Sequence, residues 1–346
     1  MAKTPQKRNW VMFLILSTMA TLYGLKAHEV LGRLVTYRST ALSINTIHTA
    51  KHTLKTHGIW VYAIALSPDG ETLASGCYGG KIKLWDLRTG TIRRTLAAHE
   101  DAISSLAIST DGKTLVSGSW DNRVAVWDLQ TGKRLKTLDE AKDDVSAIAL
   151  SPDGQYVAAS AADKTLRLWD LKTGQQIRQR KTPTVVLSLA FSPDGKVLAG
   201  GGRDRMIRFW QRQHLAPTYA LEGHRGAVRS IAFSPEGTYL ASGSQDQSTK
   251  VWHLQEGQLL QTLTGHDGPV LSVAFSPDGH SLASSSYDQT IKLWQPLSGK
   301  PLGNFVGHTK SVRAIQFSPD GQTLVSSGSD TTIRVWPVST AIVQAQ

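Results

Sequence analysis

The stretch of sequence that decides the fold begins at Leu263, ends at Gly299 and reads LTGHDGPVLSVAFSPDGHSLASSSYDQTIKLWQPLSG. Val270 to Phe275 is a short apolar run, as expected for a strand that is buried on both faces. The sequence SPDG at Ser276–Gly279 predicts a turn, because proline fixes φ and Asp-Gly tolerates unusual backbone angles. Two further strands, and a fourth beyond a second turn, are predicted at Ser281–Ser285, at Thr290–Trp294 and after Ser298-Gly299.

This unit recurs along the chain at a nearly constant period. Its tryptophan stands 41 or 42 residues from the next one at Trp85, Trp127, Trp169, Trp210, Trp252, Trp294 and Trp336. A period in the low forties, with four short strands in each unit, is typical of a β-propeller. We therefore predict an all-β, seven-bladed β-propeller of four-stranded antiparallel blades over residues 49–346. Its repeats are expected at about 53–94, 95–136, 137–179, 180–220, 221–261, 262–303 and 304–346.

The spacing of two short motifs carries a family resemblance. A Gly-His pair, such as Gly265-His266, stands about thirty residues before the tryptophan, which several units follow with aspartate. From about Thr49 to its end, the chain resembles the WD-repeat (WD40) family. The resemblance implies a seven-bladed propeller that acts as a rigid platform for contacts with other proteins.

The resemblance also implies a stabilising network in which a loop His, a strand Ser, a turn Asp and the Trp are linked. A buried Trp N–H needs an acceptor, and the His–Asp pair would orient its neighbours. Four units carry the complete tetrad, at His99, Ser117, Asp121 and Trp127; at His224, Ser242, Asp246 and Trp252; at His266, Ser284, Asp288 and Trp294; and at His308, Ser326, Asp330 and Trp336. Because the same trio recurs at fixed offsets in four units, we interpret it as structural and not as a hydrolase site.

Three units depart from this pattern. The first has Gly79 where Asp is expected, although it keeps the His, the Ser and the Trp. The third and fourth lack the His and the Ser, and carry instead Ala141 and Ala159, and Thr182 and Gly200. Either these networks have drifted, or this sector of the ring has loops that are remodelled for a partner.

Two segments compete to close the ring. Thr49 to Leu54 matches the outer strand that precedes each unit, whereas Ala341 to Gln346 follows Trp336 at the spacing of an outer strand. Only one of them can pair with the third strand of the last blade, and we predict the N-terminal one. Closure removes an open sheet edge that would invite aggregation.

The positive charge is concentrated near the N-terminus. The chain has a net charge of +11, with seven Lys/Arg and one acidic residue in positions 1–52, which contribute +6. A nucleic-acid-binding protein gathers its charge on its folded domain, so nucleic acid is not the expected partner. A basic segment that flanks an apolar run suits an anionic membrane surface better. The single cysteine, Cys77, excludes an intramolecular disulfide and a thiolate metal cluster.

Residues 1–48 contain an apolar run that the repeats do not explain. Trp10 to Leu25 is uncharged and reads as a helix, either an uncleaved membrane anchor, which we favour, or the core of a signal peptide. The membrane-contacting side chains would include Trp10, Phe13, Leu14, Leu16, Leu22 and Tyr23. A short amphipathic or linker helix is predicted at about His28–Tyr37. The basic residues on the two sides of the apolar run are balanced, so they do not decide which side of the membrane would hold the propeller.

The loops that carry the tetrad His and Asp should meet at one rim of the ring. The residue before each Asp, and those between each His and the next strand, are expected to face solvent there. The predicted partner-binding residues on this rim are Trp60, Tyr78, Trp120 and Tyr287, and the basic Arg203, Arg205 and Arg225. Exposed aromatic groups are typical of interface hot spots, although each ring could instead lie flat over a neighbouring loop.

No catalytic motif was found, and no catalytic residue, cofactor or metal is expected. We therefore expect a non-catalytic, membrane-tethered scaffold that binds other proteins, as a subunit or assembly factor of a membrane complex. Two alternatives stay open at this point. The propeller could be secreted or periplasmic after signal cleavage, or it could be a sensor that binds a ligand or nucleic acid through Arg203, Arg205 and Arg225.

Overall fold

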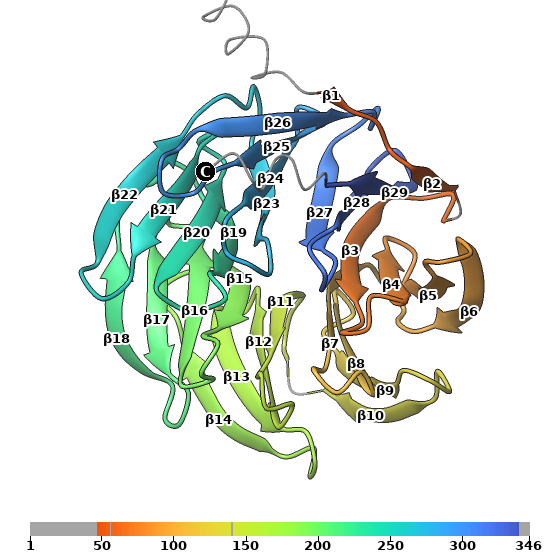
Figure 1. The fold of residues 1–346 in the computed structure, drawn as a ribbon. Helices are drawn as coiled ribbons and strands as arrows, with labels where there is room; N and C mark the ends of the chain where they lie inside the picture. The colour runs from red at the N-terminus through yellow and green to blue at the C-terminus, as the bar shows by residue number, and fades with distance from the viewer. Residues whose placement is uncertain (1–46, 56, 140, 339–346) are drawn as a thin grey trace, which may run out of the picture. The chain divides into compact units, whose positions relative to one another are not determined.

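The computed structural model describes residues 47–338, apart from positions 56 and 140. Seven antiparallel sheets stand as blades around a common centre (Figure 1), so the predicted seven-bladed propeller is confirmed. The predicted apolar helices and the C-terminal candidate for ring closure lie outside the described residues. Within the described part, no helix has the length and apolar character needed to cross a membrane.

Each blade runs from an inner strand at the centre of the ring to an outer strand at its edge. Blades 1 to 3 consist of β3 (Val61–Leu66), β4 (Thr72–Cys77), β5 (Lys81–Asp86) and β6 (Thr91–Ala97); β7 (Ile103–Ile108), β8 (Thr114–Ser119), β9 (Val124–Asp128) and β10 (Arg134–Leu138); and β11 (Val145–Leu150), β12 (Tyr156–Ala161), β13 (Thr165–Asp170) and β14 (Gln176–Lys181). Blades 4 and 5 consist of β15 (Val186–Phe191), β16 (Val197–Gly202), β17 (Ile207–Gln211) and β18 (Ala216–Leu221); and β19 (Val228–Phe233), β20 (Tyr239–Ser244), β21 (Thr249–His253) and β22 (Gln258–Leu263). Blade 6 contains β23 (Val270–Phe275), β24 (Leu282–Ser286), β25 (Thr290–Trp294) and β26 (Pro301–Val306), and blade 7 contains β27 (Val312–Phe317), β28 (Thr323–Gly328) and β29 (Thr332–Pro337).

The N-terminal segment completes the ring, as predicted. Strand β2 (His52–Lys55) pairs with β29 in antiparallel register and becomes the fourth strand of blade 7. A second contact was not predicted: β1 (Ile47–His48) pairs in parallel with β26 and adds a fifth strand to blade 6. The two strands therefore attach one segment to two neighbouring blades.

The SPDG turns are stabilised by their own side chains. In blade 1, Ser67 Oγ accepts the N–H of Thr72 and Asp69 accepts the N–H of Glu71, both at 2.9 Å. Gly70 has a φ of +73°, a conformation that a residue with a Cβ rarely adopts. We call the end of the ring that carries these turns the turn face, and the opposite end, where the inner strands begin, the loop face.

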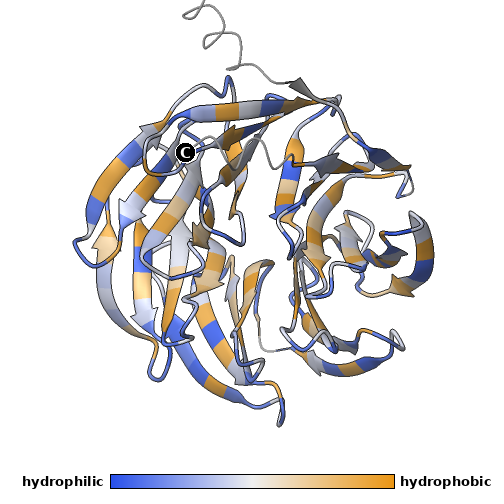
Figure 2. Ribbon diagram, viewed as in Figure 1, coloured by the Kyte–Doolittle hydropathy of each residue, from blue (hydrophilic) through white to orange (hydrophobic). Residues whose placement is uncertain are grey.

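The core lies between the blades. Hydrophobic and hydrophilic residues follow one another along many of the strands (Figure 2). The buried apolar side chains of neighbouring blades pack in seven separate clusters, one at each blade interface. Trp127 of blade 2, for example, packs with Ile82 and Leu84 of blade 1. Because blade 7 packs against blade 1 in the same way, every sheet is covered and the ring presents a rigid platform.

Candidate interaction surface on the loop face

Four blades position their loops through the complete tetrad of Trp, Ser, His and Asp. In blades 2, 5, 6 and 7 the Trp Nε1–H donates to Ser Oγ, Ser contacts His Nε2, and His Nδ1 contacts Asp Oδ2, each at 2.8 or 2.9 Å. Each Asp also accepts the backbone N–H that follows the His, so the network joins two loops. The four serines have no exposed surface, and no substrate could reach their hydroxyls.

The buried tetrad aspartates are held in the ionised form. Burial alone would raise the pKa of Asp246, but hydrogen bonds from His224, Ser248 and the N–H of Arg225 outweigh it and hold that pKa well below its usual range. The same balance lowers the pKa of Asp288 and Asp330. At neutral pH the loop face is therefore fixed by charge-assisted hydrogen bonds.

Blades 3 and 4 hold the same aspartate with an arginine. Arg167, which is only 1% exposed, donates to Asp163 at 2.7 Å, and Arg208 donates to both oxygens of Asp204 at 2.9 and 2.6 Å. Each arginine stands four residues after its aspartate, on the third strand of its blade. In these two blades an arginine has thus replaced the missing histidine as the partner of the aspartate, and the turns keep their support.

Blade 1 has neither the complete tetrad nor an Asp–Arg pair. His57 Nε2 contacts Ser75 at 2.7 Å and Trp85 donates to the same hydroxyl at 2.8 Å, as in the complete tetrads. With Gly79 at the Asp position, His57 Nδ1 is buried and has no hydrogen-bond partner among the described residues. Burial and the charge of Lys83 lower the pKa of His57 to about 4.

An aromatic cluster occupies the loop face of blades 1 and 2. It consists of Trp60, Tyr62, Tyr78 and Trp120, whose ring centroids lie 5.5 to 6.4 Å apart. Trp60 and Tyr78 are 42% and 43% exposed. The structure therefore brings three of the predicted rim aromatics together and leaves two of them open to solvent.

The remaining predicted rim residues lie apart from this cluster. Trp120 is half-buried against Tyr62 and Tyr78, so it supports the cluster more than it faces solvent. Tyr287, on blade 6, is 62% exposed and makes no ring contact with another described aromatic residue. Arg205 and Arg225 are exposed, and Arg205 adopts a φ of +75° in the turn after Asp204.

A cavity of about 310 Å³ opens at the loop-face end of the central channel, and we call it the channel cavity. One residue from the start of each inner strand contributes to its wall: Tyr62, Ser104, Ser146, Leu187, Arg229, Leu271 and Arg313. Arg203 and Trp120, each of which precedes the loop-face aspartate of its blade, also line it, together with Asp144, Ala162 and Val185. Of the predicted basic sector, only Arg203 lines this cavity.

The inner-strand positions of this cavity were not predicted, although the sequence repeat makes them visible. Tyr62, Arg229 and Arg313 occupy the same position in their units, and none of them was singled out from the sequence. Arg313 lies 4.9 Å from the ring centroid of Tyr62 and donates from Nε to Ser329 at 2.8 Å. The cation–π contact joins the aromatic cluster to the channel cavity.

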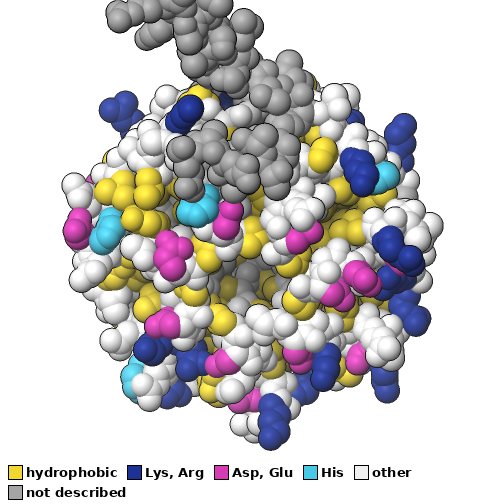
Figure 3. Space-filling view, viewed as in Figure 1, with side chains coloured by type: hydrophobic (Ala, Val, Ile, Leu, Met, Phe, Trp, Pro, Cys, Tyr) yellow, Lys and Arg dark blue, Asp and Glu magenta, His cyan; other side chains and the backbone are white. Residues whose placement is uncertain are grey.

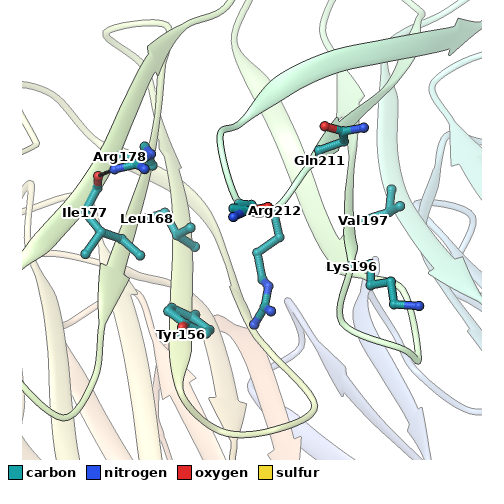
Figure 4. Close-up of a pocket in the computed structure, with 9 residues that line it drawn as sticks. Tyr156, Leu168, Ile177, Arg178, Lys196, Val197, Gln211 and Arg212 are labelled. Carbon is teal, nitrogen blue, oxygen red and sulfur yellow. Dashed lines mark hydrogen bonds between the residues drawn. The ribbon is translucent and has the colours of Figure 1, made fainter.

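A second cavity, of about 850 Å³, lies on the turn-face side between blades 3 and 4 (Figure 4). The guanidinium of Arg212 lies 4.5 Å from the ring centroid of Tyr156 and pairs with Asp153 at 3.1 Å, and Lys196 pairs with Asp194 at 3.6 Å. Two of the three basic side chains that line this cavity therefore have acidic partners, and the third, Arg178, donates to the carbonyl of Ile177. On the face seen in Figure 3, acidic side chains likewise surround the central hollow and most basic ones lie at the periphery.

Metal ligation finds no support in the described residues, since no group of three His, Cys, Asp or Glu side chains converges there.

Comparison with known families gives two matches. A family model described as IFT122 first beta-propeller matches residues 60–247, and the model described as WD domain, G-beta repeat matches residues 257–295 and 299–337. No curated protein matches the chain.

Proposed function

Because this chain belongs to the WD-repeat β-propeller family, whose propellers generally bind other proteins, we propose that it is a non-catalytic scaffold that binds its partner on the loop face. The observation that carries the proposal is the aromatic cluster. Trp60 and Tyr78 present large apolar rings to solvent, while Tyr62 and Trp120 hold them in place from below. Rigid, partly exposed aromatic rings lose little conformational entropy on binding and are enriched among interface hot spots.

Two further features of the loop face support a protein partner. The tetrads and the Asp–Arg pairs fix the loops, so a partner meets a surface that is already ordered. Charges of opposite sign lie on different blades, with Asp143 and Asp144 on blade 3 and Arg203 and Arg225 on blades 4 and 5. Such a pattern favours one orientation of a partner protein over others.

We further propose that the propeller is tethered to a membrane as part of a membrane complex. The support is the sequence: Trp10–Leu25 is an uncharged run with Lys7 and Arg8 before it and Lys26 after it. Carbonate extraction of membranes from cells that express the full chain tests this tether. Release of the protein with a mature N-terminus beyond Ala27 would instead establish a secreted or periplasmic propeller.

Affinity purification from detergent-solubilised membranes tests the binding surface. We expect the double variant Trp60→Ala/Tyr78→Ala to capture the partner at least tenfold less well than the wild type, because each hot spot contributes roughly 2 kcal/mol. Tyr219→Ala is the matched control, since Tyr219 is also 43% exposed but lies on outer strand β18, stacked on Phe209. Undiminished capture by the folded double variant would remove the aromatic cluster from the interface.

A further inference from the structure

Three arginines converge on the channel cavity from different blades. Arg203 comes from the loop after β16, Arg229 from β19 and Arg313 from β27, and all three line the cavity. Arg229 is half-buried, and its pKa is lowered by burial and by the charges of Arg313 and Arg203. Because all three side chains line one cavity, Arg229 lies near the charges of both other guanidinium groups.

This positive charge is not neutralised within the described part of the chain. Neither Arg203 nor Arg229 forms a salt bridge with a described residue, and Arg313 donates to a neutral serine hydroxyl. Asp144 lines the same cavity, but burial and the nearby Asp143 and Asp101 raise its pKa. A guanidinium paired with Asp144 would instead lower the pKa of that carboxyl.

Three other arginines, on blades 3 and 4, show the usual way in which this protein neutralises a partly buried guanidinium. Arg167, Arg208 and Arg212 each have a carboxylate within 3.1 Å. Partly buried cations without counterions raise the free energy of the folded state unless an anion joins them. Guanidinium groups also bind carboxylate and phosphate oxygens with well-defined geometry.

We propose that the channel cavity is an anion-binding site that accepts one carboxylate or phosphate group carried by a side chain of the partner protein. A volume of about 310 Å³ accommodates one such side chain. Trp60 and Tyr62 adjoin Arg313, so the aromatic cluster and the anion site form one continuous surface. The assignment of a protein partner rests on the proposed function, whereas the anion site itself can be tested without a partner.

Calorimetric titration of the purified full chain tests the site, in buffer with 150 mM chloride, about the physiological ionic strength. The probes are pyrophosphate, a phosphoserine pentapeptide, and its glutamate and glutamine counterparts. We expect saturable binding of pyrophosphate and of at least one anionic peptide, and at least tenfold weaker binding of the glutamine peptide. Comparison of the phosphoserine and glutamate peptides shows which anion the site prefers.

Arg229→Gln is the decisive variant. It should weaken the binding of every anionic probe at least tenfold and raise the melting temperature in the absence of anions, because it relieves repulsion among the guanidinium groups. Arg180→Gln removes the same charge from the exposed outer strand β14 and should leave binding within twofold of the wild type.

Two results would overturn the proposal in different ways. Pyrophosphate binding without binding of either anionic peptide would show that the site takes a free anion, so the partner side chain would be the wrong source. An absence of saturable binding of all probes, or equal binding by Arg229→Gln, would remove the site altogether. The proposed function can also fail by itself. If pyrophosphate still binds but the Trp60→Ala/Tyr78→Ala variant captures its partner normally, the anion site stands and only the proposed function is contradicted.

Discussion

Blades 6 and 3 hold the same turn aspartate by different means. In blade 6, His266 contacts Asp288 at 2.8 Å and connects it through Ser284 to the core tryptophan. In blade 3 the histidine position is Ala141, and Arg167 reaches Asp163 from the third strand at 2.7 Å. The fold therefore requires a cationic or N–H partner for this carboxylate, and it does not require histidine in particular.

Blade 1 completes the comparison because it has kept the histidine and lost the aspartate. Its turn has Gly79, so that His57 has one bonded ring nitrogen and one buried nitrogen that finds no partner among the described residues. A histidine without its carboxylate is held neutral by burial. Departures from the repeat pattern are thus compensated in blades 3 and 4 but not in blade 1.

The largest expected effect comes from removing the arginine of blade 3. Arg167→Met should lower the free energy of unfolding by about 3–5 kcal/mol, because it leaves a buried carboxylate without its partner. Urea unfolding followed by tryptophan fluorescence measures the loss. Arg208→Met is the matched control, and its loss should be smaller because the side chains of its pair are 20% and 34% exposed, against 2% and 13% in blade 3. Equal losses in the two variants would contradict the role given to burial.

A smaller effect is expected from opening a complete tetrad. Ser284→Ala removes the acceptor of the Trp294 N–H and the partner of His266, and should cost about 2 kcal/mol in the free energy of unfolding. The same urea experiment measures it, with Ser298→Ala as a control. Ser298 bonds only at the exposed surface, so its loss should stay within about 0.5 kcal/mol. A cost for Ser284→Ala no greater than that of its control would show that the tetrad does not stabilise blade 6.

The smallest effect, a gain, is expected from restoring the aspartate of blade 1. A Cβ at Gly79 meets no atom within 4 Å, so Gly79→Asp can present a carboxylate to His57 without a clash. We expect the melting temperature to rise by about 1–2 °C at pH 7 for a gain of roughly 1 kcal/mol. Differential scanning calorimetry measures this rise.

The pH dependence of stability gives a second test of the Gly79→Asp variant. The pKa of His57 is about 4 in the folded protein and 6.5 in its usual state, so the unfolded chain takes up the proton first as the pH falls. The wild type therefore loses stability from about pH 6.5 towards pH 4, whereas the new carboxylate stabilises the imidazolium in the folded variant. The advantage of Gly79→Asp should widen between pH 7 and pH 5, and that of Gly79→Asn should not. A constant advantage for both variants would contradict the assigned state of His57.

The fold was predictable because its signals repeat. Proline and glycine in the SPDG turns, and the tryptophan at a period of 41 or 42 residues, specify seven units without knowledge of contacts between them. The first three strands of the unit that begins at Leu263 were predicted to within one residue: β23 and β25 match, and β24 runs Leu282–Ser286 instead of Ser281–Ser285.

The candidate site was only partly predictable, because it depends on contacts between units. Trp60, Tyr78 and Trp120 were found because they stand beside the tetrad residues, whereas Tyr62 was missed inside an inner strand. The role of Arg167 was also hidden, since a basic residue stands at the same position in other blades, for example Lys250 and Lys292. Only the packed structure shows which of these cations reaches an aspartate.

The closure of blade 7 by strand β2 has a consequence for how the protein folds while it is being synthesised. Lys55 pairs with Thr332, and roughly 280 residues separate them along the chain. At a synthesis rate of about 5–20 residues per second, β2 waits roughly 15 to 55 s for its partner strand to be made. During that interval β2 has an unpaired edge that is open to pairing with other chains. The last blade is therefore the stage of maturation at which a chaperone that covers strand edges would help this protein most.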